Sequence, residues 1–129
     1  MIAISTALSD SRLNAVISFL ALGTNPAIAH VYDGIRPTFG ETPTGNLLVS
    51  IALAEPVGTV SGGVLTVIPT ADAVIGATGN ATWARVVNGD GSLAWDCDVS
   101  DLNGSGELRM PVTTLYAGGA ARIVSGNLG

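Results

Sequence analysis

The sequence predicts a mainly β fold, an antiparallel β-sandwich or barrel-like domain with one short N-terminal helix. Short apolar runs with strand-like alternation recur along the chain, and turn clusters that hold most of the seventeen glycines separate them. Only one segment has helical spacing. Apolar residues make up 47% of the 129 residues but aromatic residues only 5%, so Ala, Val, Ile and Leu are expected to fill the core of a single domain over residues 1–129.

The first predicted element is a helix over residues 9–22. Its apolar side chains recur three and four residues apart, at Leu13, Val16, Ile17 and Leu20. Polar residues at positions 9 to 11 offer capping oxygens, and Gly23 is a natural stop. The apolar stripe predicts that this helix packs on a sheet or on a neighbouring subunit.

The rest of the chain predicts a β domain over residues 27–124. The first strand, 27–33, ends at Asp33-Gly34. Residues 35–45 then hold two prolines and two glycines, which predicts a loop long enough for an interaction role. Further strands are predicted at 47–53, 63–68, 81–88, 93–99, 107–110 and 120–124. Residues 71–79 fit either a short strand or a loop.

Two of these strands, 81–88 and 93–99, form a predicted hairpin on an Asn-Gly-Asp-Gly turn, with Gly89-Asp90 or Asp90-Gly91 at its tip. Both choices give the same two faces. The predicted core face carries Thr82, Ala84, Val86, Leu93, Trp95, Cys97 and Val99. The predicted outer face, on the solvent side, carries Trp83, Arg85, Val87, Ala94, Asp96 and Asp98.

The outer face places Trp83 beside a cross-strand pair of Arg85 and Asp96. One interpretation is a surface ion pair, with Trp83 lying across it or under a loop or helix. The other is a subunit interface, since Trp and Arg are enriched among binding hot spots. With the 35–45 loop, this face gives the candidate interface residues Tyr32, Arg36, Pro37, Phe39, Trp83 and Arg85.

The charge pattern argues against nucleic acid and membranes as partners. Lysine is absent, and five arginines are scattered singly among ten acidic residues, for a net charge of −5. Binding to phosphate backbones needs clustered cations. The longest apolar run, residues 47–54, is far shorter than a bilayer span. The apolar stretch 13–22 lacks the basic start and cleavage site of a secretory signal.

The sequence contains no recognisable catalytic, cofactor or metal motif, so we predict a protein that is not an enzyme. His30 is the only histidine, which excludes a site of several imidazoles and leaves one candidate base. No serine lies in a nucleophile-elbow motif. The aspartates at positions 90, 96, 98 and 101 lack the spacing of an EF-hand. The single cysteine, Cys97, is expected to be a buried, inert thiol.

Several motifs, in their order along the chain, resemble a family of small virion proteins of tailed bacteriophages. After the helix come YDGIRP at Tyr32 to Pro37, LLV at Leu47 to Val49, ATWARVV at Ala81 to Val87 with Gly91, and DCDVSDL at Asp96 to Leu102. The likeness covers nearly the whole chain. Cysteine at position 97, where such proteins prefer a small residue, is a departure.

This resemblance implies a capsid decoration or minor head protein. Such a protein is a non-enzymatic β domain without cofactors that is made in the bacterial host cytoplasm and binds the major capsid protein on the capsid exterior of the virion. It would be a homo-oligomer, with a trimer favoured. A tail, neck or fibre component of the same virion is the alternative. A carbohydrate or cell-surface binding module that stacks sugars on Trp83 and Tyr32 also stays open, as does an enzyme that uses His30.

Overall fold

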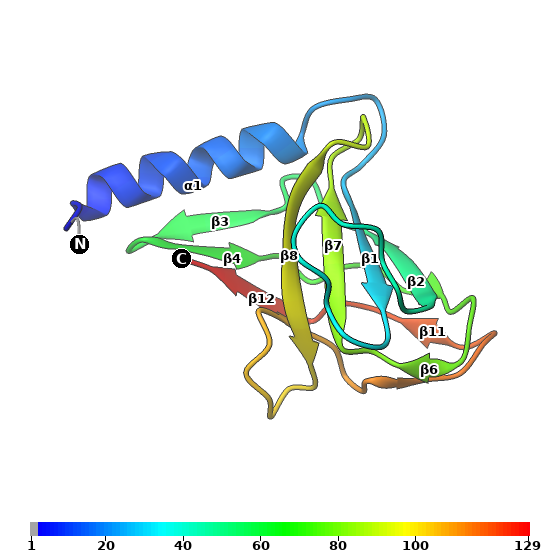
Figure 1. Cartoon of the computed structure of the whole chain (residues 1–129). Helices are drawn as coiled ribbons and strands as arrows, with labels where there is room; N and C mark the ends of the chain where they lie inside the picture. Colours follow the sequence, from blue (N-terminus) through cyan, green and yellow to red (C-terminus); the bar gives the residue numbers. More distant parts are fainter. Residues whose placement is uncertain (1–2) are drawn as a thin grey trace.

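The computed structural model describes residues 3–129 and is mainly β, with 36% of residues in strands and 12% in a helix. One helix and a large, curled, mostly antiparallel sheet make up this part of the chain (Figure 1). The predicted fold class is confirmed. The helix is α1 (Thr6–Leu20), and the strands are β1 (Ile28–Tyr32), β2 (Leu47–Ala52), β3 (Gly58–Ser61), β4 (Val64–Val67), β5 (Ala73–Val74), β6 (Gly79–Asn80), β7 (Trp83–Val87), β8 (Leu93–Ser100), β9 (Leu108–Arg109), β10 (Thr114–Leu115), β11 (Ala120–Ala121) and β12 (Ser125–Leu128).

Eight strands form the large sheet, in the order β2-β1-β7-β8-β9-β12-β4-β3. Two further sheets, β10-β6 and β11-β5, have two strands each and are not hydrogen-bonded to the large sheet as strands. Every pair is antiparallel except β8 with β9, which run parallel over two residues. The sheet therefore has two halves, and the short β8-β9 contact joins them.

Helix α1 begins earlier than predicted, because Ser5 is its N-cap and accepts a hydrogen bond from the N–H of Leu8 at 3.1 Å. Residues 9 to 11, expected to cap it, lie inside the helix. Leu13 and Leu20 are buried, and α1 packs against β3, β4 and β8. The prediction that this helix packs on a sheet is thus confirmed, and Figure 1 shows it lying alongside β3.

The predicted strands at 27–33, 47–53, 63–68, 81–88 and 93–99 match β1, β2, β4, β7 and β8 closely. The predicted strands at 107–110 and 120–124 shrink to the two-residue β9 and β11. Sequence reasoning missed β3 and β12, because GTVS and SGNL lack a run of alternating apolar residues. Both are strands because each pairs with β4.

Aliphatic side chains fill the core, as the composition predicts. Its fully buried members include Leu48, Ile51, Leu65, Met110, Leu115 and Ile123. Of the predicted core face of the hairpin, Ala84, Val86, Cys97 and Val99 are buried. Leu93 is a correction, because it is 41% exposed. It lies near the hairpin tip, where β7 is the only strand paired with β8.

The hairpin itself has one of the two predicted registers. Trp83 lies opposite Asp98 and Arg85 opposite Asp96. Gly91 has a φ of +84° in the turn, and its N–H donates to the carbonyl of Asn88. The register shifts by one residue between Val86, which lies opposite Trp95, and Val87, which lies opposite Leu93. The N–H of Asn88 also donates to the carbonyl of Ser92, so the loop has three residues, Gly89 to Gly91, and is neither of the two predicted two-residue tips. Glycine adopts the positive φ at position 91 without strain.

Candidate functional site

The candidate site is the outer face of β1, β7 and β8, together with the loop that covers it. Two rows of side chains cross these strands. One row runs from Tyr32 through Trp83 to Asp98, and the other from His30 through Arg85 to Asp96. We call residues 33–46 the covering loop. In Figure 1 it is cyan and passes over β7.

Trp83 is fully buried beneath this loop, with an exposed fraction of 0%. Its ring stacks on the ring of Tyr32, with centroids 4.6 Å apart and planes at 15°. Its indole N–H donates to the carbonyl of Asp33 at 3.3 Å. The expectation that Trp83 faces solvent or a partner is therefore wrong, because the covering loop takes that place. The alternative interpretation, a tryptophan under a loop, is the one that holds.

Arg85 is also buried, so its pair with Asp96 is not a surface ion pair. Arg85 Nε lies 2.8 Å from Asp96 Oδ1, and Arg85 Nη2 donates to Asp96 Oδ2 at 3.0 Å. The two side chains are 10% and 3% exposed. The hydrogen bonds that Arg85 donates to Asp96 raise the pKa of Arg85, and the guanidinium carbon lies 5.5 Å from the Trp83 ring centroid. Such a buried pair is costly to break from one side.

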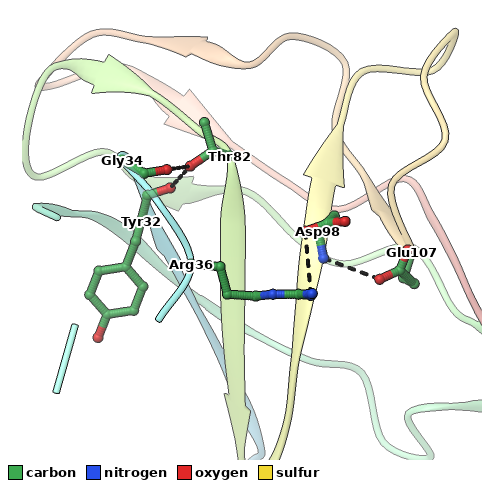
Figure 2. A network of polar contacts seen from close by, with 6 residues as sticks. All are labelled: Tyr32, Gly34, Arg36, Thr82, Asp98 and Glu107. Carbon is green, nitrogen blue, oxygen red and sulfur yellow. Dashed lines mark hydrogen bonds and ion pairs between the residues drawn. The ribbon is translucent and has the colours of Figure 1, made fainter. Parts of the chain in front are cut away.

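Polar contacts fasten the covering loop to the sheet. Arg85 Nη2 donates to the carbonyl of Glu41 at 2.9 Å. Figure 2 shows two further contacts: Arg36 Nη1 lies 3.3 Å from Asp98 Oδ1, and Thr82 Oγ1 donates to the carbonyl of Gly34 at 2.7 Å. At the base of the loop, the N–H of Asn46 donates to Asp33 Oδ1 at 2.6 Å. The loop is therefore held along its length.

This fixed loop presents two apolar side chains to solvent, Ile35 at 85% exposure and Phe39 at 56%. Apolar side chains at such exposure on a held loop are available to a partner without a large loss of backbone freedom. Sequence reasoning named Phe39 but missed Ile35, although Ile35 lies within the YDGIRP motif.

The six residues predicted for an interface all lie on this face or in the covering loop. The structure divides them into three groups. Trp83 and Arg85 are buried, Tyr32 and Pro37 are half-buried, and Arg36 and Phe39 are exposed. Only the last two groups offer surface to a partner.

Two grooves flank β8 and share Ala94 and Trp95. The first, which we call the loop groove, measures about 500 Å³, and it is lined by Arg36, Pro37, Thr38, Phe39, Ala94, Trp95 and Asp96. The second, the helix groove, measures about 380 Å³, and it is lined by Arg12, Ala15, Val16, Phe19, Leu93, Ala94 and Trp95. Trp95 was predicted to lie in the core but is half-buried, because it forms a wall of both grooves.

His30 has a partner that the sequence did not indicate. Its Nδ1 lies 2.8 Å from Ser50 Oγ, on the neighbouring strand β2. Burial lowers the pKa of His30. On its other side, His30 lies opposite Arg85 in β7. A histidine that activates a serine must become an imidazolium, and the burial that lowers the pKa of His30 disfavours that charge. This pair is therefore poorly arranged for acid–base catalysis.

Metal and thiol chemistry have little support in the described residues. No group of three or more His, Cys, Asp and Glu side chains that could hold a metal ion occurs in residues 3–129. Cys97 is buried, as predicted. Burial raises its pKa to about 12, so the thiol stays protonated and is a weak nucleophile at neutral pH.

Comparisons of this chain with protein-family models, curated proteins and solved structures gave no match. Within residues 3–129, no helix combines the length and the apolar character needed to cross a membrane.

Proposed function

We propose that this protein is a structural component of a tailed-phage virion, a decoration or minor head subunit that binds the major capsid protein on the outside of the capsid. In this proposal it is not an enzyme and acts as a homo-oligomer, with a trimer favoured. The observation that carries the proposal is the covering loop, which is fastened to the sheet and presents Ile35 and Phe39 to solvent.

The motif that resembles phage virion proteins builds this loop. Tyr32 stacks on Trp83 at the base of the loop. Gly34 has a φ of +77°, which glycine adopts without strain, and its carbonyl accepts from Thr82. Arg36 pairs with Asp98 on β8. Each of these residues fixes the position of the loop, so the YDGIRP motif has a physical role in forming a docking surface.

A held apolar loop suits a subunit that reinforces a shell. Burial of apolar surface contributes about 25 cal/mol per Å², and a loop that is already ordered loses little entropy on binding. A modest contact repeated over many sites, and joined within an oligomer, gains avidity. Such a subunit needs no catalytic residues.

The test uses heads assembled with and without this protein. Heads that lack it should burst at a lower temperature, and purified protein added back should restore the bursting temperature of the complete heads. A labelled protein should appear on the head in electron micrographs. Heads that are equally robust without it would refute the reinforcing role. A label on the tail, neck or fibre would favour the alternative placement.

The sugar-binding alternative loses its main support from the same geometry. A stacking platform needs an exposed aromatic face, and both faces of the Trp83 ring are enclosed within this chain.

A further inference from the structure

Strand β8 has an open edge along its first half. On one side, Leu93 to Asp98 pair with β7. On the other side, β9 pairs only with Val99 and Ser100. Within residues 3–129, no strand lies beside residues 93–97 on that second side. This stretch is an edge strand in the middle of the sheet, where its two halves separate.

The backbone of Asp96 points toward this open side. The N–H of Val99 donates to the carbonyl of Thr82, on the β7 side. The N–H of Asp98 points the other way and donates to Glu107 Oε1 at 3.2 Å, as Figure 2 shows. Because successive N–H groups of a strand alternate in direction, the N–H and C=O of Asp96 face the same side as those of Asp98. No strand within residues 3–129 pairs with them, so they can pair with an added strand.

The two grooves lie on either face of this edge. Side chains of a strand alternate between its faces. A strand added beside β8 would therefore place one set of side chains in the helix groove and the next set in the loop groove. The groove walls include Leu93, 41% exposed, and Phe39, 56% exposed. This is the arrangement by which sheet edges bind extended peptides: backbone hydrogen bonds give affinity, and pockets for alternate side chains give specificity.

We propose that the open edge of β8 binds an extended segment of another protein, with apolar side chains at alternate positions and basic residues at its ends. Acidic side chains at the two ends of β8 favour basic ends on this segment, and the arginines that line the grooves, Arg12 and Arg36, disfavour basic residues in its centre. The exposed Asp90 lies before β8, and the exposed Asp101 and Glu107 lie at its far end. In the described residues none of the three has an ion-pair partner. In an antiparallel pair of two β8 strands, each copy would bring the same acidic ends and a net charge of −5 against the other. A basic segment would neutralise them instead.

The test needs only the purified full-length protein, so its outcome is independent of the head experiment. The probe is a synthetic peptide with alternating Val and Thr in its centre and two lysines at each end. The first control carries glutamates in place of the lysines, and the second is N-methylated in its centre. The probe should slow hydrogen exchange at the Asp96 amide and bind about tenfold or more tightly than either control.

Variants of the chain locate the binding. Leu93→Ser and Phe39→Ser should each weaken binding of the lysine probe, whereas Val74→Ser, at a more exposed apolar position on β5, should not. An Asp96 amide that exchanges at the same rate with about 1 mM probe, the weak end of specific binding, would overturn the proposal. Protection that grows with protein concentration alone would overturn it too, because a second copy would then be the occupant.

Discussion

Arg85 connects strand β8 to the covering loop. Its guanidinium donates hydrogen bonds to Asp96 on β8 and to the carbonyl of Glu41 in the loop. The side chains of Arg85 and Asp96 lie where little water reaches them. A charge that loses its partner in such a place keeps its desolvation cost without compensation. Arg85 therefore stabilises the face that the covering loop protects.

We predict that Arg85→Met lowers the free energy of unfolding by about 3 kcal/mol or more, because it leaves Asp96 buried without a partner. The double variant Arg85→Met/Asp96→Leu should regain much of this loss, because it removes both charges. Urea unfolding measures both effects. The matched control is Arg122→Met, because Arg122 pairs with Asp72 at 3.6 Å on the surface and should cost less than about 1 kcal/mol. Equal losses for the two single variants would contradict the buried-pair argument.

His30 gives the stability of the protein a pH dependence. Burial lowers its pKa from the ordinary value of 6.5, so the unfolded chain takes up the proton more readily than the folded chain. Stability should therefore be full above pH 6.5 and should fall as the pH drops from 6.5 toward the folded pKa. His30→Gln should remove this slope, and because His30 is the only histidine, the comparison is clean. Urea unfolding at several pH values between 5 and 7.5 measures it. A wild-type curve that is flat over this range would contradict the prediction.

At the scale of elements, α1 closes the gap between the two halves of the sheet. It contacts β3 and β4 in one half and β8 in the other. Asp10 Oδ1 accepts a hydrogen bond from the N–H of Gly63 at 2.7 Å, which ties the helix to the β3-β4 turn. No described strand lies beside the first half of β8 on the side away from β7. Helix α1 covers the core there instead, and it forms one wall of the helix groove.

Two leucines of α1 offer a matched test of this role. Leu13 is buried against the core, and Leu8 is exposed on the same helix. We predict that Leu13→Ala lowers the free energy of unfolding by about 2 to 4 kcal/mol and Leu8→Ala by less than about 1 kcal/mol. Thermal unfolding followed by circular dichroism compares the two. If both variants cost the same, packing of α1 on the sheet does not contribute to stability.

The elements themselves were largely predictable from the sequence, and the cover over the site was not. The hairpin register follows from turn chemistry and from a period of two residues, so the Arg85–Asp96 pair could be predicted. A loop of prolines and glycines has no such period, and its path depends on contacts distant in sequence, such as that of Arg85 with Glu41. The prediction of an exposed Trp83 failed for this reason. The same limit hid the contact between His30 and Ser50, which pairing of β1 with β2 creates.

At the scale of the whole molecule, two of the places that expose apolar side chains lie on different elements. One is the covering loop, with Ile35 and Phe39. The other is formed by Val74 on β5 and by Tyr116, whose carbonyl accepts a hydrogen bond from Gly119, next to β11. An oligomer that also binds a shell needs two different contact surfaces, one for its own copies and one for the shell. The two places match this requirement, and the proposed function assigns the loop to the shell.

This assignment predicts which variants no longer bind and stabilise phage heads. Ile35→Ser and Phe39→Ser remove apolar surface that the fold does not need, so the purified variants should unfold within about 0.5 kcal/mol of the wild type. Added to heads that lack the protein, they should no longer raise the bursting temperature. Val74→Ser should still bind and protect such heads, because it changes the other surface. Cosedimentation with the heads measures binding separately from protection. If Val74→Ser fails to bind and Phe39→Ser binds normally, the shell contact lies at the β5 end and the covering loop serves another contact.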